Sequence, residues 1–289
     1  MKCVKSSIIN NSRINCSLEI NHEGKCNINK KKKFYFLCGL PRSGNTLFSS
    51  IMNQNPKISV TANSMISNIF IGAELLKTSE IYNNYPDEKS LDNITKNIIP
   101  NYYSHWKEDY IIDRSIWGFP TTFEILKKYP PNEIKIIILV RDIKEILASF
   151  IKFSYSSNDN YIAKEGKTLE ERCDYIMKNG GSLHKWIQSV YNLTRPENSK
   201  YIHLIEYNDL VNNTEYEIDK VYKYLEIEPF KHRFTNLSQL TNNGISYNDS
   251  IVGLGLHTIK EDVIEKSDYN IWDYLPKDVN NMYTLDSFW

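Results

Sequence analysis

From residue 34 onward, the chain alternates short apolar runs with amphipathic segments. The first run, FYFLC at 34–38, is short and followed by glycine, which is typical of a buried strand. The strongest run, IKIIILV at 134–140, is apolar on both faces, as expected for a central strand of a parallel sheet. Directly after the first run, apolar side chains at helical spacing predict a helix: Leu47, Phe48, Ile51 and Met52.

The same alternation continues through most of the chain. Helix 169–193 is expected to break near Gly180 and Gly181, and the signals weaken after Pro229, where an irregular C-terminal region is expected. Strands that alternate with helices predict a single α/β domain with a mostly parallel sheet, flanking helices and an irregular C-terminal region. Further strands are expected at 57–61, 109–113 and 201–207, and helices at 64–77, 91–106, 120–129, 142–153, 169–193 and 213–227.

Composition and charge limit the function classes. Residues 1–33 are polar and rich in Asn and Lys, so we expect a flexible extension before one domain at 34–289. The net charge of the 289 residues is zero, which gives no reason to expect binding to nucleic acid or to a membrane. No signal peptide or membrane span is recognisable, and the five cysteines form no C-x-x-C pair. These features predict a soluble, cytoplasmic protein with reduced thiols.

The segment FLCGLPRSGNTLFSS at 36–50 has the pattern of a phosphate-binding loop that lacks its lysine. Gly39 and Gly44 occupy the two glycine positions, and Thr46 occupies the hydroxyl position. Asn45 replaces the lysine, and Arg42 lies inside the loop.

This loop is expected to bind an anion. It joins a strand to a helix, and the unpaired N–H groups of a helix N-terminus attract phosphate. Gly44 allows close approach of the backbone, Thr46 adds a hydroxyl, and Arg42 supplies a cation. Without the lysine, which works on the β- and γ-phosphates together with magnesium, ATP or GTP chemistry becomes doubtful.

A second anion site is indicated by LVRDIKEILASF at 139–150. Arg141 ends the strongest strand, at the sheet edge where α/β proteins bind ligands. Asp142 is placed to cap the next helix, with Glu145 in the position that completes a capping box. Ser149 follows Asp142 by two helical turns, roughly 10 Å along the axis. Arg141 and Ser149 are therefore expected to meet one phosphate, although an Arg-Asp pair at a helix start is more often a cap with a surface ion pair.

Together, these segments resemble the sulfotransferases that use 3′-phosphoadenosine 5′-phosphosulfate (PAPS). GLPRSGNTL is similar to their 5′-phosphosulfate loop, especially in tyrosylprotein sulfotransferases and their bacterial and phage-type relatives. Their 3′-phosphate motif is an arginine followed, after seven residues, by a serine, and Arg141 and Ser149 have this spacing. The resemblance covers roughly residues 34–265. It assigns donor binding to Arg42, Ser43, Gly44, Asn45, Thr46, Leu47, Arg141 and Ser149.

The resemblance also implies the reaction. A P-loop-type α/β domain would move a sulfuryl group from PAPS to a hydroxyl or amine by direct in-line transfer. It would leave 3′-phosphoadenosine 5′-phosphate (PAP) and require no metal, because positioned donors and a cation suffice at the bridging oxygen.

Further roles follow from shorter matches. Arg114 in IIDRSIWGF resembles the basic residue that stabilises the bridging oxygen, and the resemblance implies that it would act with Arg42 as a second catalytic cation. Tyr207 in LIEYNDLV resembles the tyrosine that approaches the adenine. The loop GLGLHTIK at 253–260 resembles the loop that closes over the nucleotide and would contribute Thr258 and Lys260.

Neither the acceptor nor the catalytic base follows from the sequence. The acceptor pocket is expected in segments 61–120 and 155–185, whose Tyr, Trp and Asn content suits a glycan, a phenol or a peptide. Trp117 either lines this pocket or packs in the core. The segment VTANSMISN, where tyrosylprotein sulfotransferases place a glutamate, contains no acid. Three candidates for the base stay open: Glu74, His105 and His184.

Two alternative functions stay open. A P-loop kinase for a nucleotide or small molecule would require magnesium and ATP, and Asn45 argues against it. A non-catalytic protein that binds adenosine bisphosphate would explain why no base is recognisable.

Overall fold

The computed structural model describes residues 16–20, 26–30, 32–156, 160–181, 183–237, 264 and 269–289. The chain divides into two compact units, Met1–Lys32 and Lys33–Trp289. The first unit contains two antiparallel strands that the sequence pattern did not indicate, β1 (Cys16–Ile20) and β2 (Cys26–Lys30). The flexibility expected for residues 1–33 stays a prediction.

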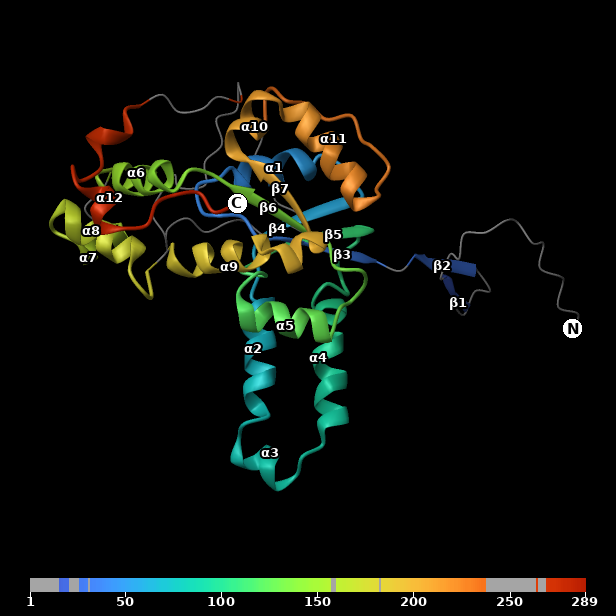
Figure 1. Ribbon diagram of the computed structural model, residues 1–289. Coiled ribbons are helices and arrows are strands. Elements are labelled where there is room, and N and C mark those ends of the chain that lie inside the picture. The colour runs from blue at the N-terminus through green and yellow to red at the C-terminus, as the bar shows by residue number, and fades with distance from the viewer. Residues whose placement is uncertain are drawn as a thin grey trace, which may run out of the picture. The chain divides into compact units, whose positions relative to one another are not determined.

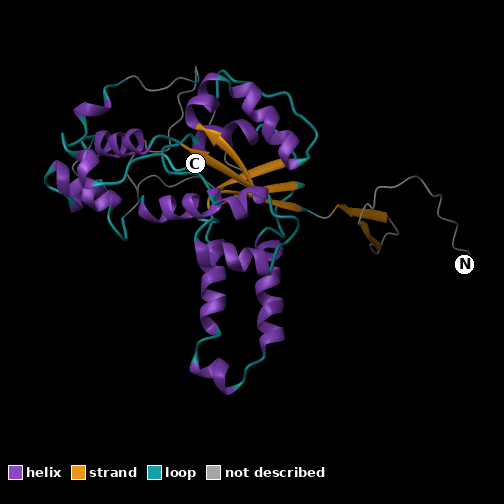
Figure 2. Ribbon diagram, in the orientation of Figure 1, coloured by secondary structure: helices purple, strands orange, loops and turns teal. Residues whose placement is uncertain are grey.

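The second unit is built on a five-stranded parallel sheet (Figures 1 and 2). All four pairs of neighbouring strands are parallel, so their carboxyl ends lie at one edge. The predicted α/β fold with a mostly parallel sheet is therefore confirmed. The apolar run 134–140 forms an interior strand, next to the middle one. In spatial order the strands are β4 (Ile58–Asn63), β5 (Tyr110–Arg114), β3 (Lys33–Leu37), β6 (Ile136–Val140) and β7 (Ile202–Glu206).

Helices connect the strands and cover both faces of the sheet (Figure 2). None of the helices in the described ranges has the length and apolar character needed to cross a bilayer. The helices are α1 (Asn45–Met52), α2 (Ile66–Leu76), α3 (Glu80–Asn84), α4 (Glu88–Tyr102), α5 (Pro120–Lys128), α6 (Ile143–Ser154), α7 (Tyr161–Glu165), α8 (Leu169–Met177), α9 (His184–Thr194), α10 (Tyr207–Asn212), α11 (Thr214–Leu225) and α12 (Val279–Met282), with 3₁₀ helices η1 (Pro196–Tyr201) and η4 (Ile271–Asp273).

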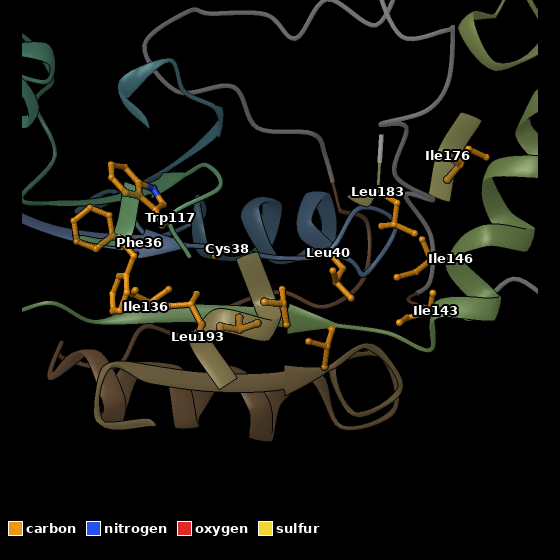
Figure 3. Packing of buried hydrophobic residues seen from close by; sticks show 14 of the residues in the cluster. Phe36, Cys38, Leu40, Trp117, Ile136, Ile143, Ile146, Ile176, Leu183 and Leu193 are labelled. Carbon is orange, nitrogen blue, oxygen red and sulfur yellow. The ribbon is translucent and has the colours of Figure 1, made fainter. Parts of the chain in front are cut away.

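Alternating side chains of the strands enter two hydrophobic cores. Leu37 and Leu139 pack with the apolar faces of α1 and α11. Phe36 and Ile138 pack on the other face with residues of α5, α6 and α9. Figure 3 shows part of this second core, where Trp117 meets Phe36 edge to face at 4.6 Å between ring centroids. Because Trp117 is fully buried there, the core alternative for this residue is confirmed.

Local sequence rules account for the start of α6. The Asp142 carboxylate accepts a hydrogen bond from the Glu145 backbone N–H at 3.1 Å, as an N-cap should. The Glu145 side chain, predicted to complete a capping box, instead accepts a hydrogen bond from Arg141 Nε at 2.8 Å. The cap by Asp142 is thus confirmed, while the Glu145 side chain pairs with Arg141 at the end of β6.

One segment extends away from the sheet. α2 and α4 run side by side and are joined by α3, and together they form an arm that we define as residues 64–103 (Figure 1). α2 begins just after the carboxyl end of β4, and α4 returns the chain toward β5. An open groove of about 410 Å³ lies between the two helices.

Candidate active site

The predicted phosphate-binding loop connects β3 to α1 at the carboxyl edge of the sheet. Its backbone is fixed to the neighbouring strand β6: Cys38 N donates to Ile137 O at 2.9 Å, and Leu40 N donates to Leu139 O at 2.8 Å. The loop therefore continues the strand pairing beyond the end of β3, and α1 begins from a backbone that the sheet holds in place.

Gly44 immediately precedes α1 and needs its glycine backbone. Its φ of 87° lies in the left-handed region, where residues with a Cβ are strained. A Cβ at this position would also lie 3.1 Å from side-chain atoms of both Tyr207 and Leu210. The glycine thus lets α10 pack closely against the start of α1.

Asn45, at the position of the missing lysine, turns its side chain into the loop. Its Nδ2 donates to Leu40 O at 2.7 Å and to Ser43 Oγ at 3.3 Å. Ser43 Oγ in turn donates to Leu139 O at 3.0 Å. Both side chains are buried and shape the loop. What Ser43 and Asn45 can offer a ligand is therefore the backbone N–H of a helix N-terminus, next to the partly exposed Thr46.

Arg42 and Arg141 join the loop to α6. Arg42 Nε donates to Ser149 Oγ at 3.1 Å, and Arg141 Nη1 donates to the Arg42 carbonyl oxygen at 3.0 Å. Arg141 is only 8% exposed, and its Nε is paired with Glu145 Oε2 at 2.8 Å. The structure therefore brings together Arg42, Arg141 and Ser149, which the sequence assigned to two separate anion sites, and the ion pair of Arg141 is a largely buried one with Glu145.

The electrostatics of this cluster favour an anion. Burial lowers the pKa of the Arg42 guanidinium, and the positive charge of Arg141 lowers it further. Tyr269, Tyr207 and Tyr161 raise the same pKa and so oppose these effects. A negative charge bound beside the two arginines would relieve both the desolvation and the mutual repulsion.

Tyr207 lies against the same cluster. The Arg141 guanidinium carbon is 4.3 Å from the centroid of the Tyr207 ring, within the range of a cation–π interaction. The ring also packs on Gly44, so one tyrosine contacts the start of α1 and the end of β6. Its predicted approach to an adenine stays a prediction, and the packing role is directly seen.

Arg114 ends β5 and lies beside the loop. It is the parallel partner of Leu37, the last residue of β3, and the next residue along, Ser115, donates its N–H to Leu37 O at 3.2 Å. The Arg114 guanidinium carbon lies 5.4 Å from the ring centroid of Trp186 on α9. The side chain is 7% exposed, so a cation is held inside the protein beside the end of β3.

The other predicted residues are not brought into this cluster by the contacts observed. Thr258 and Lys260 lie outside the described residues. Among the candidates for the base, Glu74 pairs with Lys77 at 2.8 Å on the arm, and His105 is exposed beside Trp106. His184 begins α9, the helix that also carries Trp186.

A buried acid that the sequence analysis did not single out lies next to Arg114. The Asp113 carboxylate accepts hydrogen bonds from Tyr103 Oη, from Ser64 Oγ at 2.9 Å and from Trp117 Nε1 at 2.8 Å. Burial raises its pKa to about 6, against the effect of these donors. The bonds tie both ends of the arm to β5. The sequence signal that could have indicated this buried acid is the aspartate at the end of the apolar run YIID, because aspartate is rarely buried.

Among the solved structures that resemble this chain, three are described here. The first is the mouse sulfotransferase SULT7A1 complexed with PAP, at 15% identity over 87% of this chain and 83% of that one, with a TM-score of 0.52. The second is a sulfotransferase from Alicyclobacillus acidocaldarius, at 13% identity over 76% of this chain and 88% of that one, with a TM-score of 0.47. The third is the sulfotransferase domain of the Synechococcus PCC 7002 olefin synthase, at 14% identity over 93% of this chain and 88% of that one, with a TM-score of 0.42. The first likeness shows a shared fold.

The family comparison is decisive. Residues 32–243, most of the chain, match the sulfotransferase domain family, whereas no curated protein matches the sequence. This match covers the loop, Arg114 and the Arg141–Ser149 pair, and it sets aside the kinase alternative. The chain belongs to the sulfotransferase family and is an enzyme of PAPS-dependent sulfuryl transfer.

Proposed function

We propose that this sulfotransferase holds its donor at both charged ends: the 5′-phosphosulfate at the loop that carries Arg42, and the 3′-phosphate at Arg141 and Ser149. The observation that supports this most directly is the Arg42–Ser149 hydrogen bond of 3.1 Å. It joins the cationic Arg42 of the loop to the helix that follows Arg141, across 107 positions of the chain. A doubly anionic nucleotide fits such a pair, whereas a single anion would need only one of them.

The loop supplies the groups for the phosphosulfate. The N–H groups at the start of α1, including those of Thr46 and Leu47, would donate to the phosphate oxygens. The Arg42 guanidinium would lie at the bridging oxygen, where negative charge develops as the sulfur–oxygen bond breaks. Arg114, buried beside the loop, would add the second positive charge at the same oxygen.

Arg141 and Ser149 would take the 3′-phosphate. Arg141 is now paired with Glu145, which keeps the guanidinium in place before the nucleotide binds. The phosphate would share the remaining N–H groups of Arg141 and replace Arg42 as partner of Ser149 Oγ. Binding at one end would therefore release Arg42 for the other end.

The transfer itself is a direct displacement. An oxygen or nitrogen of the acceptor attacks the sulfur, a new bond to sulfur forms, and the bond from sulfur to the bridging phosphate oxygen breaks. PAP leaves with the bond electrons, and the acceptor loses its proton to a base. Glu74, His105 and His184 stay the candidates for that base, and a cytoplasmic location stays a prediction.

The acceptor is proposed to be a glycan, a phenol or a peptide, bound by residues from segments 61–120 and 155–185. The arm belongs to the first segment and is attached to β5 directly beside Arg114. This supports an acceptor site on the arm's side of the carboxyl edge, at a distance from the Arg141–Ser149 pair.

The test is transfer of labelled sulfate from PAPS to a panel of glycans, phenols and tyrosine peptides. We expect the wild-type enzyme to label at least one class, with Arg42→Ala as the background. Tight binding of PAP without transfer to any acceptor would instead indicate the non-catalytic alternative. Failure to bind either PAP or PAPS would contradict the donor site itself.

A further inference from the structure

The C-terminal residues contribute a tyrosine to the surface of α6 that carries Ser149. Residues of η4 pack against α6. Just before η4, the Tyr269 ring lies over Lys152, with 4.1 Å between Nζ and the ring centroid. Lys152 follows Ser149 by about one helical turn, so the two side chains lie on the same face of α6. Tyr269 is therefore held one turn from the residue that Arg42 contacts.

The Tyr269 hydroxyl has an unusual environment. Its oxygen is buried, and it has no hydrogen-bond partner among the described residues. Leaving a buried hydroxyl without a partner destabilises a protein, so such a group is rare unless something else binds it. Among the three tyrosines that raise the pKa of the Arg42 guanidinium, Tyr269 has the largest effect.

We propose that the Tyr269 hydroxyl binds an anionic oxygen of the nucleotide beside Arg42 and Ser149, so that the C-terminal segment completes the donor site. The proposal depends on the donor site proposed above. A phenol hydroxyl is a suitable donor to phosphate, because it adds a hydrogen bond without adding a further positive charge to the two arginines already present.

Two sources of this oxygen are chemically equivalent, namely the 3′-phosphate and the 5′-phosphosulfate. The position of Tyr269 over α6 favours the 3′-phosphate, because Ser149 lies on that helix and the loop does not. Lys152 is held by both Tyr269 and Tyr274, at 4.1 and 5.8 Å from their ring centroids, and would increase the positive potential around the same phosphate.

The experiment compares Tyr269→Phe with Tyr283→Phe by calorimetric titration with PAP, adenosine 5′-phosphate and adenosine 3′-phosphate. Tyr283 lies in the same C-terminal segment, but its hydroxyl already donates to Asp174 Oδ1 at 2.5 Å. Both substitutions remove one hydroxyl and keep the ring. The melting temperature of each variant is measured with and without PAP.

We expect Tyr269→Phe to weaken binding of PAP and adenosine 3′-phosphate about tenfold and leave binding of adenosine 5′-phosphate unchanged. Without nucleotide its melting temperature should equal or exceed that of the wild type, because the hydroxyl that is removed has no hydrogen-bond partner in the part of the chain that the structure describes. Tyr283→Phe should show the opposite result, with a lower melting temperature and unchanged affinities.

A loss confined to adenosine 5′-phosphate and PAP would also support the hydroxyl contact, and would assign it to the phosphosulfate end. Unchanged affinity for all three nucleotides in Tyr269→Phe would overturn the proposal while leaving the donor site intact. If the wild-type enzyme itself failed to bind PAP, the donor site would be wrong as well, so the two failures are distinguishable.

Discussion

The loop between β3 and α1 and the arm at 64–103 both leave the carboxyl edge of the sheet, but they handle polar and apolar groups in opposite ways. In the loop, the side chains of Ser43 and Asn45 are turned inward and hydrogen-bonded. In the arm, many apolar side chains are exposed, although others such as Phe70 and Ile99 are buried in the core. Many of the exposed large apolar residues that the structure describes lie there: Met65, Ile69, Leu75, Leu76, Ile81, Tyr85, Ile94 and Tyr102.

This difference agrees with the proposed division between donor binding at the loop and acceptor binding on the arm's side of the sheet. The donor is the same molecule for every PAPS-dependent enzyme, so its loop needs fixed spacing and buried bracing bonds. The arm carries no spacing of that kind, and its groove is lined by uncharged residues such as Ile69, Asn97 and Tyr102. Substitutions should therefore have large effects in the loop and small ones on the arm, except where the arm is tied to β5.

The largest effect is expected for Arg42→Ala. The variant loses the bond to Ser149 and the positive charge that we propose to act at the bridging oxygen, so kcat/KM for PAPS should fall about 1000-fold. Arg195→Ala is the matched control, because Arg195 forms an exposed ion pair with Glu197 and should retain wild-type activity. If the kcat/KM of Arg42→Ala were within tenfold of that of the control, Arg42 would have no catalytic role.

The next effect concerns Asp113, where the arm joins β5. Its pKa is about 6 in the folded protein because of burial, above the value of an exposed aspartate. A raised pKa means that its contribution to stability is present at low pH and is lost as the pH rises through about 6. Asp113→Asn stays neutral, so its stability relative to wild type should rise by up to about 3 kcal/mol between pH 4 and pH 8.

Urea unfolding of both proteins across this pH range measures that difference. The amide nitrogen of the variant can donate to Tyr103 Oη as the protonated acid would. A difference in stability that does not change with pH would show that Asp113 is ionised throughout the range in the folded protein, as an exposed aspartate is in the unfolded chain.

A smaller effect on stability is expected when a glycine is replaced by alanine, once in the loop and once in the arm. An alanine Cβ at Gly39 would lie 2.0 Å from Asn45 Oδ1 and 3.0 Å from Leu139 Cβ, so Gly39→Ala should destabilise the protein by about 2 kcal/mol. At Gly72, on α2 of the arm, a Cβ meets nothing within 4 Å. Gly72→Ala should instead stabilise by about 0.5–1 kcal/mol, because alanine favours a helix. Equal destabilisation in urea titrations would contradict the contrast between loop and arm.

The sequence predicted those features that depend on near neighbours in the chain. The five strands of the sheet were recognisable from apolar runs, and the Asp142 cap from its position before α6. Arg141 and Ser149 were recognisable because their spacing along a helix fixes their relative positions. The short helices α3, α7 and α10 were missed, since five or six residues carry too little periodicity.

Contacts between distant segments were beyond a single sequence. The contact of Arg42 with Ser149 joins residues 107 positions apart, and the bonds of Asp113 reach both ends of the arm. Nothing near Tyr269 in the chain indicates that it lies over Lys152. These contacts depend on how the chain folds back on the sheet, and periodicity reports only on local structure.

The central claim is that Arg141 and Ser149 bind the 3′-phosphate while the loop binds the 5′ end. Calorimetric titration of Arg141→Ala with PAP and with adenosine 5′-phosphate tests it most directly, with Arg195→Ala as control. We expect affinity for PAP to fall about 100-fold and affinity for adenosine 5′-phosphate less than tenfold, the smaller loss reflecting the bond from Arg141 to the Arg42 carbonyl. Equal losses for the two nucleotides would contradict the claim.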